Sequence, residues 1–266
     1  MLVFGIILLL AGAGCVFAAS RAQRRVHAMT AAETLTVPEL LDRREIAASL
    51  GAEFRTVCEV VGETAPAPVG LLRSELAGVE CVWHSSRVQR RYTHHDRDSD
   101  GATRVTTRTE TVAEQTSPHG WALLCDGHTI GVDHGGRRPE GVEQVVDRFE
   151  PAGDRQPQGA LAGAISVLGA LAGGDRDETI GYQHTEWVLR PGARMYVLGE
   201  VATEPGPSGD GPLVIRPPRD GSAFVISTRT EEELTADARR GQRIRAWVGA
   251  ALALGGLALL VAALVF

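Results

Sequence analysis

Uninterrupted apolar residues occupy the two ends of the chain, and alternating or polar residues fill the region between them. The first segment, residues 1–19, contains the uncharged run Leu2–Ala19, and the second is residues 247–266. A helix rises about 1.5 Å per residue, so about 20 apolar residues match a hydrocarbon core of about 30 Å. The pattern therefore predicts a transmembrane helix at each end. Gly12-Ala13-Gly14-Cys15 leaves a lipoprotein cleavage site as an alternative for the first segment, although the leucine expected three residues before the cysteine is absent.

Arginine residues flank both apolar segments on the side that faces the middle of the chain. They are Arg21, Arg24 and Arg25 after the first segment, and Arg239, Arg240, Arg243 and Arg245 before the second, which begins with Trp247. Basic residues are retained on the cytoplasmic side of a membrane, and tryptophan favours the headgroup level. We therefore expect these residues at the membrane interface and residues 20–246 in the cytoplasm, in a two-pass membrane protein.

Two capping boxes predict where helices begin. Thr36-x-x-Glu39 opens a short amphipathic helix that ends near Gly51, so residues 20–50 are predicted to be a linker and this helix. Thr230-x-x-Glu233 opens a juxtamembrane helix, residues 230–246, which continues into the second apolar segment. The uncharged segment 159–171 is too short to span a bilayer and is interpreted as a buried or capping helix, with a helix on the membrane surface as the alternative.

Runs rich in valine, threonine and aromatic residues, separated by turn residues, predict β-strands over much of the remaining chain. The predicted strands are Phe54–Val61, Val79–His94, Thr103–Thr116, Trp121–Cys125, Thr129–Asp133, Arg194–Val201, Leu213–Arg216 and Ala223–Ser227. Asp126-Gly127 predicts a tight hairpin, and Gly199 marks a bulge or a close backbone approach. The predicted fold class is α+β: a β-rich antiparallel barrel or sandwich, residues 51–229, between two transmembrane helices.

Composition excludes several classes of protein. The net charge of -6 and an aromatic content of 5% argue against nucleic-acid binding. All 27 basic residues are arginine, which excludes a Schiff-base lysine and a P-loop lysine. Candidate serine, histidine and aspartate triads follow no hydrolase signature, and no catalytic residue is assigned.

The residues offer two weak metal sites, and we predict that the domain binds neither metal nor cofactor. Asp96, Asp98, Asp100 and Gly101 match the first half of a calcium loop, but Thr107 occupies the position of the bidentate glutamate. Cys125, His128 and His134 form an alternative zinc set around the predicted hairpin, although surface histidines are the more common interpretation. The four cysteines, Cys15, Cys58, Cys81 and Cys125, lack the spacing of a RING, and we expect no RING to follow the last segment.

The stretch Glu186–Leu234, with EWVLRPG, YVLGEV, LVIRPP and FVISTRTEEEL, resembles the GIDE domain family, which includes MAPL-type mitochondrial E3 ubiquitin ligases. The residues that carry the resemblance are Cys81, Val82, Trp83, Asp126, Gly127, Trp187, Pro191, Gly192, Gly199, Glu200 and Ser227. The resemblance implies a bacterial-type member without the RING, acting as a non-catalytic partner-binding module at the membrane. Ubiquitin transfer with a RING supplied by another chain, and a divergent membrane hydrolase, are the alternatives. The expected partners are the lipid bilayer and an unidentified protein, with homo-oligomers left open.

Overall fold

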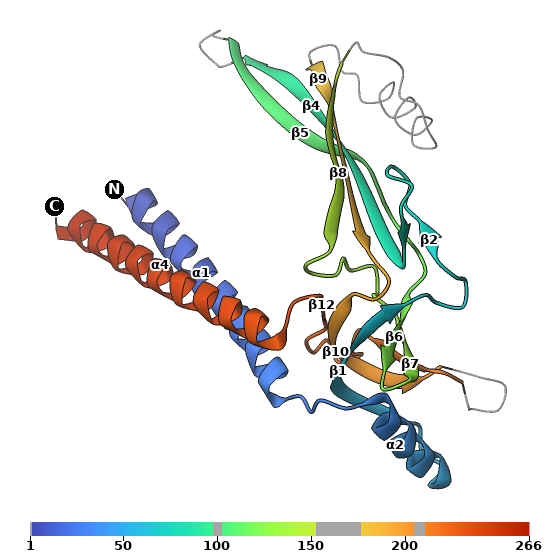
Figure 1. The fold of residues 1–266 in the computed structure, drawn as a ribbon. Helices are drawn as coiled ribbons and strands as arrows, with labels where there is room; N and C mark the ends of the chain where they lie inside the picture. Colours follow the sequence, from blue (N-terminus) through green and yellow to red (C-terminus); the bar gives the residue numbers. More distant parts are fainter. Residues whose placement is uncertain (1, 98–102, 153–176, 205–210, 266) are drawn as a thin grey trace. The chain divides into compact units, whose positions relative to one another are not determined.

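The computed structural model describes residues 2–97, 103–152, 177–204 and 211–265, which form two compact units (Figure 1). The first unit comprises Met1–Gly62, Leu124–Ile130 and Arg194–Phe266. The second comprises Glu63–Leu123 and Gly131–Ala193. The predicted segment 159–171 lies outside the described residues.

Two long helices of the first unit, α1 (Leu2–Ala31) and α4 (Glu231–Val265), pack as an antiparallel pair with both chain ends at the same end of the pair (Figure 1). Small residues allow the close approach: a Cβ atom at Gly12 would lie 3.2 Å from the carbonyl oxygen of Gly249. Helix α1 continues beyond Ala19 because Met29 is buried in the core of the unit, so the stretch 20–31 is helical where we expected a linker. Within the described part of the chain, no helix is both long enough and apolar enough to cross a membrane.

Six strands form one sheet, in which five strands close into a barrel. They are β1 (Arg55–Ala65), β6 (Trp121–Cys125), β7 (His128–Val132), β10 (Arg194–Thr203), β11 (Leu213–Arg216) and β12 (Val225–Ser227). The order is β1-β6-β7-β11-β10-β12, and an additional β1–β10 pairing closes the ring. Strand β10 pairs antiparallel with both β11 and β12. Of the two predicted β-rich architectures, a barrel or a sandwich, the structure has the barrel.

A hydrophobic core in the first unit joins the helix pair to this sheet. Met29 from α1 and Leu234 from α4 pack with Tyr196 and Leu198 of β10 and with Val225 of β12. Every one of these side chains is at most 5% exposed, so the inner ends of both helices are fixed against the strands.

A four-stranded sheet dominates the second unit, in the order β5-β4-β9-β8. Its strands are β4 (Trp83–Arg97), β5 (Thr103–Thr116), β8 (Glu143–Pro151) and β9 (Asp177–Leu189). The predicted long hairpin is present as β4 and β5, paired antiparallel over their length. The segment before it forms a separate strand, β3 (Glu80–Cys81), which pairs with β2 (Leu72–Arg73).

Local signals in the sequence produced the local structures that they predicted. Helix α2 (Val37–Ser49) begins with the Thr36–Glu39 capping box and is followed by Gly51 at a φ of 69°. Thr230 and Glu233 form the second capping box. Asp126 and Gly127 have φ values of 49° and 77°, as a two-residue hairpin turn with positive φ at both positions requires.

Candidate functional site

The residues that carry the family resemblance are distributed over both units. Asp126, Gly127, Gly199, Glu200 and Ser227 belong to the first unit, and Cys81, Val82, Trp83, Trp187, Pro191 and Gly192 belong to the second. Each group is therefore described within its own unit.

In the first unit, Gly199 and Glu200 hold neighbouring strands together. A Cβ atom at Gly199 would lie only 2.8 Å from the carbonyl oxygen of Arg216, which confirms the predicted close approach. The Glu200 carboxylate accepts hydrogen bonds from Arg55 at 3.0 Å, from Arg216 at 3.4 Å and from the backbone of Arg219 at 3.3 Å. Because Glu200 is only 8% exposed, these hydrogen bonds compensate its burial and stabilise the barrel.

The start of helix α4 is fixed by short polar contacts. The backbone N–H of Arg229 donates to the hydroxyl of Ser227, and the Arg229 guanidinium pairs with Asp237 at 2.5 Å. Ser227 is fully buried and pairs with Tyr196 between β12 and β10. The signature serine thus connects the last strand to the helix.

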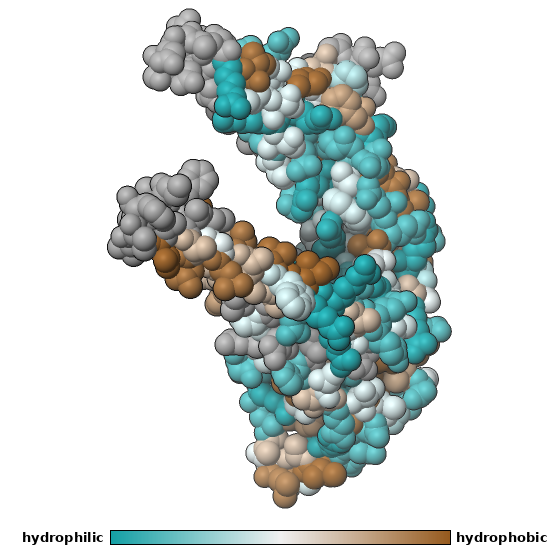
Figure 2. Space-filling view, turned by 90° about the vertical axis from the view of Figure 1, so that its left-hand side faces the viewer, coloured by the Kyte–Doolittle hydropathy of each residue, from teal (hydrophilic) through white to brown (hydrophobic). Residues whose placement is uncertain are grey.

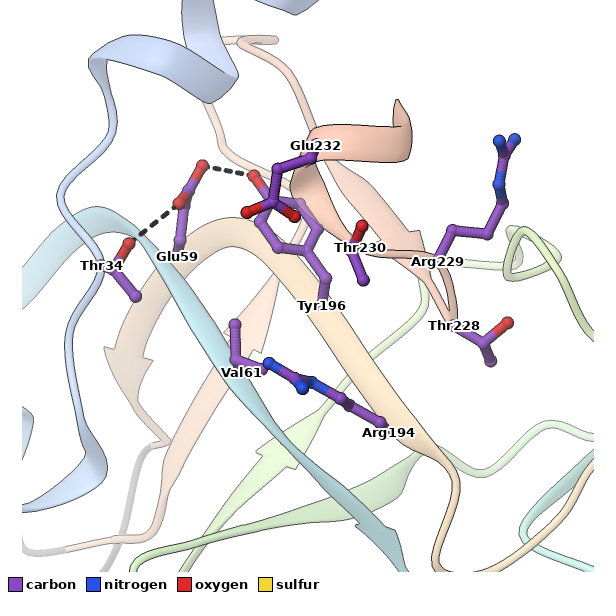
Figure 3. Close-up of a pocket in the computed structure, with 9 residues that line it drawn as sticks. All are labelled: Thr34, Glu59, Val61, Arg194, Tyr196, Thr228, Arg229, Thr230 and Glu232. Atoms are coloured by element: carbon purple, nitrogen blue, oxygen red, sulfur yellow. Dashed lines mark hydrogen bonds between the residues drawn. The ribbon is translucent and has the colours of Figure 1, made fainter. Parts of the chain in front are cut away.

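A small polar pocket lies beside this helix start, with a volume of about 150 Å³ (Figure 3). It is lined by Thr34, Glu59, Val61, Arg194, Tyr196, Thr228, Arg229, Thr230 and Glu232. The buried carboxylate of Glu59 accepts hydrogen bonds from the Tyr196 hydroxyl and, at 3.1 Å, from the Thr34 hydroxyl (Figure 3). These bonds tie the segment after α1 to strands β1 and β10.

In the second unit, Glu186 fixes the turn between β2 and β3. Its carboxylate is fully buried and accepts hydrogen bonds from the backbone N–H groups of Leu76 at 2.9 Å and Ala77 at 2.8 Å. The glutamate of the EWVL motif is therefore a structural anchor for this turn, which sequence reasoning did not anticipate.

The ring of the adjacent residue, Trp187, contacts two arginines. The guanidinium carbon of Arg138 is 4.2 Å from the ring centroid and that of Arg87 is 5.6 Å from it. Further along the same sheet, Arg91 lies 5.4 Å from the ring centroid of Phe149. Cations above aromatic rings are attracted by the ring quadrupole. The sequence singled out Trp187 but gave no indication of its arginine neighbours.

Trp83, Trp121 and His134 form a buried aromatic cluster in the second unit. His134 stacks on Trp121 at a centroid distance of 5.9 Å and meets Trp83 edge-on at 6.3 Å. Its Nε2 donates to the carbonyl oxygen of Ser117 at 3.2 Å. Burial lowers the pKa of His134, so the ring is held neutral inside this cluster.

Of the cysteines, Cys58 and Cys81 are buried and Cys125 is half-buried. Burial raises the pKa of Cys58 to about 12 and that of Cys81 to about 11, so neither is a reactive thiolate. Across ranges 2–97, 103–152, 177–204 and 211–265, no three histidine, cysteine or acidic side chains gather as metal ligands. His128 is exposed, with Nδ1 bonded to the Asp126 carbonyl oxygen, whereas His134 is buried. Asp98, Asp100 and Gly101, which match part of a calcium loop, lie outside the described residues.

The predicted membrane-interface residues of α4 are exposed. Arg239, Arg240, Arg243 and Arg245 all face solvent, and the Trp247 side chain is 79% exposed. Figure 2 shows apolar residues along this helix pair. Arg21, Arg24 and Arg25 lie in α1, and their side chains are outside the described part.

These features define a β-rich protein with a closed five-stranded barrel, a four-stranded sheet and a long helix pair. A family model described as GIDE, E3 ubiquitin ligase, matches residues 89–262, and the chain therefore belongs to the GIDE family. The expected family resemblance is confirmed. No curated protein matches the chain, and no solved structure matches it.

Proposed function

We propose that this chain is a membrane-anchored, non-catalytic member of the GIDE family that binds partner proteins beside the bilayer. The family description relates the chain to E3 ubiquitin ligases. Of the two tasks of a ligase, binding a partner and transferring ubiquitin, we propose that this chain performs only the first. The observation that carries the proposal is the apolar outer surface of the α1–α4 pair, bordered by arginines and a tryptophan.

The helix pair exposes large apolar side chains on both helices. Phe17 of α1 and Leu254 of α4 are each 69% exposed, and Leu10, Leu257 and Val261 are also mostly exposed. Contiguous apolar surfaces of this kind on a protein are typical of contacts with a membrane or another protein. A hydrocarbon environment would cover both helices at once, whereas a single protein partner would cover one side.

The basic residues support a bilayer as the environment of the pair. Gly12 lies opposite Gly249 and Ala253 in the antiparallel pair, so residues 21–25 lie level with about residues 238–242. Both arginine clusters therefore occur at one level of the pair, close to Trp247 in the sequence of α4. We propose that this level is the cytoplasmic membrane surface, since basic residues are retained on that side.

The absence of a catalytic role is proposed from the cysteines. Ubiquitin ligases that form a thioester need an accessible thiolate, and the Cys58 and Cys81 thiols are buried with raised pKa values. The Cys125 thiol is half-buried, and the side chain that it contacts is the carboxylate of Asp126, at 3.9 Å, and not a basic group that would activate it. A RING needs two zinc sites built from cysteine and histidine, and this sequence has four cysteines without paired spacing. The β-rich units remain as surfaces that can bind other proteins.

Membrane anchoring is tested by carbonate extraction of membranes from cells that express the full chain. We expect the protein to stay in the pellet, and Leu254→Arg combined with Leu257→Arg to release it, because each buried charge costs about 3 kcal/mol in the bilayer. Ile244→Arg, beside the existing arginines, is the matched control and should leave the protein in the pellet. Extraction of the wild-type chain would refute the anchor.

The non-catalytic role is tested with purified full chain, E1, E2 and ubiquitin, with and without a separate RING domain. We expect no ubiquitin chains with this protein alone. Formation of chains without any RING would refute the non-catalytic role. If chains form only when both this protein and the RING domain are present, the alternative of a RING supplied in trans is supported. That result would also refute the non-catalytic role.

A further inference from the structure

We infer that one face of the four-stranded sheet, carrying Arg87, Arg91, Phe149 and Trp187, binds an acidic segment of a partner protein. The inference rests on the proposed partner-binding function and names the surface and the chemistry of the partner. We call this surface the arginine–aromatic face, and it also includes Gly181, Gln183, Arg138 and Asp147.

The strand register places these residues on one face. Between β4 and β9, Arg87 is opposite Thr185 and Arg91 is opposite Gly181, and between β9 and β8 Gln183 is opposite Phe149. Residues opposite each other in an antiparallel pair, and every second residue along a strand, point to the same face. Trp187 lies two residues beyond Thr185 and therefore shares the face.

Close contacts hold the two aromatic rings of the face in place. A Cβ atom at Gly181 would lie only 2.6 Å from the Phe149 ring, so glycine at this position lets the ring lie directly over strand β9. The Trp187 ring contacts the guanidinium groups of both Arg87 and Arg138. Phe149 is 37% exposed and Trp187 is half-buried, so both rings remain accessible. Rigid tryptophan and arginine side chains of this kind are enriched among the residues that dominate binding energy at interfaces.

The charges of the face favour a partner with spaced carboxylates. Arg87 is paired with Glu114, at 2.6 Å, whereas Arg91 and Arg138 are exposed and have no carboxylate partner among the described residues. A guanidinium that already stacks on a ring can still donate two parallel hydrogen bonds to a carboxylate. Asp147 and Glu114 on or beside the same face would repel a continuous anionic surface. A protein segment with separated acidic residues fits this mixture better than a phosphate-rich membrane.

The test measures binding of the full chain, purified in detergent, to two fluorescent peptides of twelve residues. One alternates glutamate with threonine and valine, and the other has glutamine in place of glutamate. We expect the glutamate peptide to bind roughly tenfold more tightly, since two exposed charge pairs contribute about 1.4 kcal/mol in total. Arg91→Gln combined with Arg138→Gln should remove this difference.

A matched variant, Arg73→Gln combined with Arg104→Gln, removes two exposed arginines of the same unit that lie away from both rings, and should preserve the preference. Equal binding of the two peptides, or equal losses in both variants, would overturn the inference. So would a double variant that loses affinity for phosphatidylserine vesicles but not for the glutamate peptide. Carbonate extraction and the ubiquitin assay do not depend on these arginines, so a failure here leaves the proposed function standing.

Discussion

The hydroxyl of Tyr196 donates a hydrogen bond to the carboxylate of Glu59, a side chain that is only 2% exposed. Glu59 also contacts the segment after α1, because its backbone pairs with Glu33 and Leu35 at 2.9 Å each and its side chain accepts from Thr34. Removing solvent from a carboxylate is costly unless hydrogen bonds compensate it. The pair Glu59–Tyr196 therefore fixes where the helix pair joins the barrel strands.

We predict that Tyr196→Phe destabilises the protein by about 1–3 kcal/mol, because the buried Glu59 carboxylate loses a donor while the ring is retained. The measurement is the urea midpoint of the full chain in detergent, followed by far-UV circular dichroism. Tyr92→Phe, at a partly exposed tyrosine of β4, is the control and should change the midpoint little. An unchanged midpoint in Tyr196→Phe would show that the hydrogen bond contributes nothing.

Gly199 provides a steric prediction. In Gly199→Ala the new methyl group would lie 2.8 Å from the Arg216 carbonyl oxygen and 2.9 Å from the Phe224 ring. We expect a loss of about 1–3 kcal/mol in the free energy of unfolding, since the backbone of β11 has to move. Gly241→Ala in helix α4 meets no atom within 4 Å and should be neutral or stabilising by up to about 1 kcal/mol. Equal effects of the two variants would contradict the observed packing.

The buried histidines predict a dependence of stability on pH. Burial lowers the pKa of His134 below 6.5, so between the lowered value and 6.5 the unfolded chain binds more protons than the folded one. Stability is therefore complete above about pH 6.5 and falls as the pH decreases through this window. Burial also lowers the pKa of His184, which pairs with Glu150 at 3.3 Å. Between pH 7.5 and pH 5, the melting temperature of His134→Phe should decrease less than that of the wild type. An identical decrease would show that His134 does not cause the pH dependence.

The elements that were predicted correctly depend on short-range chemistry. Asp126-Gly127 predicted the hairpin because these residue types tolerate positive φ, and the threonine–glutamate pairs predicted two helix starts because both hydrogen bonds are local. Strands β8 and most of β9 were not predicted. Strand β8 is mostly exposed, and the buried part of β9 includes polar residues such as Thr185 and Glu186, so neither strand shows the alternation of apolar and polar residues that predicts a strand.

The arginine–aromatic face could not have been predicted from the sequence for a related reason. It depends on the register between β4 and β9 and on Arg138, which lies in a loop far from Trp187 along the chain. Sequence reasoning identified Trp187 as a signature residue but had no information about which residues pack against it. The two membrane helices and the cytoplasmic location stay predictions.

The side of the membrane that the units occupy is predicted from the arginines at the inner level of the helix pair. Exposed Arg239, Arg240, Arg243 and Arg245 border the apolar segment of α4 and should stay on the cytoplasmic side. Ala48 is exposed near the end of α2, so Ala48→Cys provides a reporter for this side. Cys15→Ser and Cys125→Ser remove two background thiols, and Cys58 and Cys81 are buried.

We expect a membrane-impermeant maleimide to label Ala48→Cys only after the cells are permeabilised. A cysteine added after Phe266 should be labelled in intact cells, because α4 carries that end away from the arginine level. Each position controls for the other, since expression, reagent and background thiols are the same. Labelling of Ala48→Cys in intact cells, with protection of the added cysteine, would place the units on the opposite side and show that the arginines do not determine the orientation.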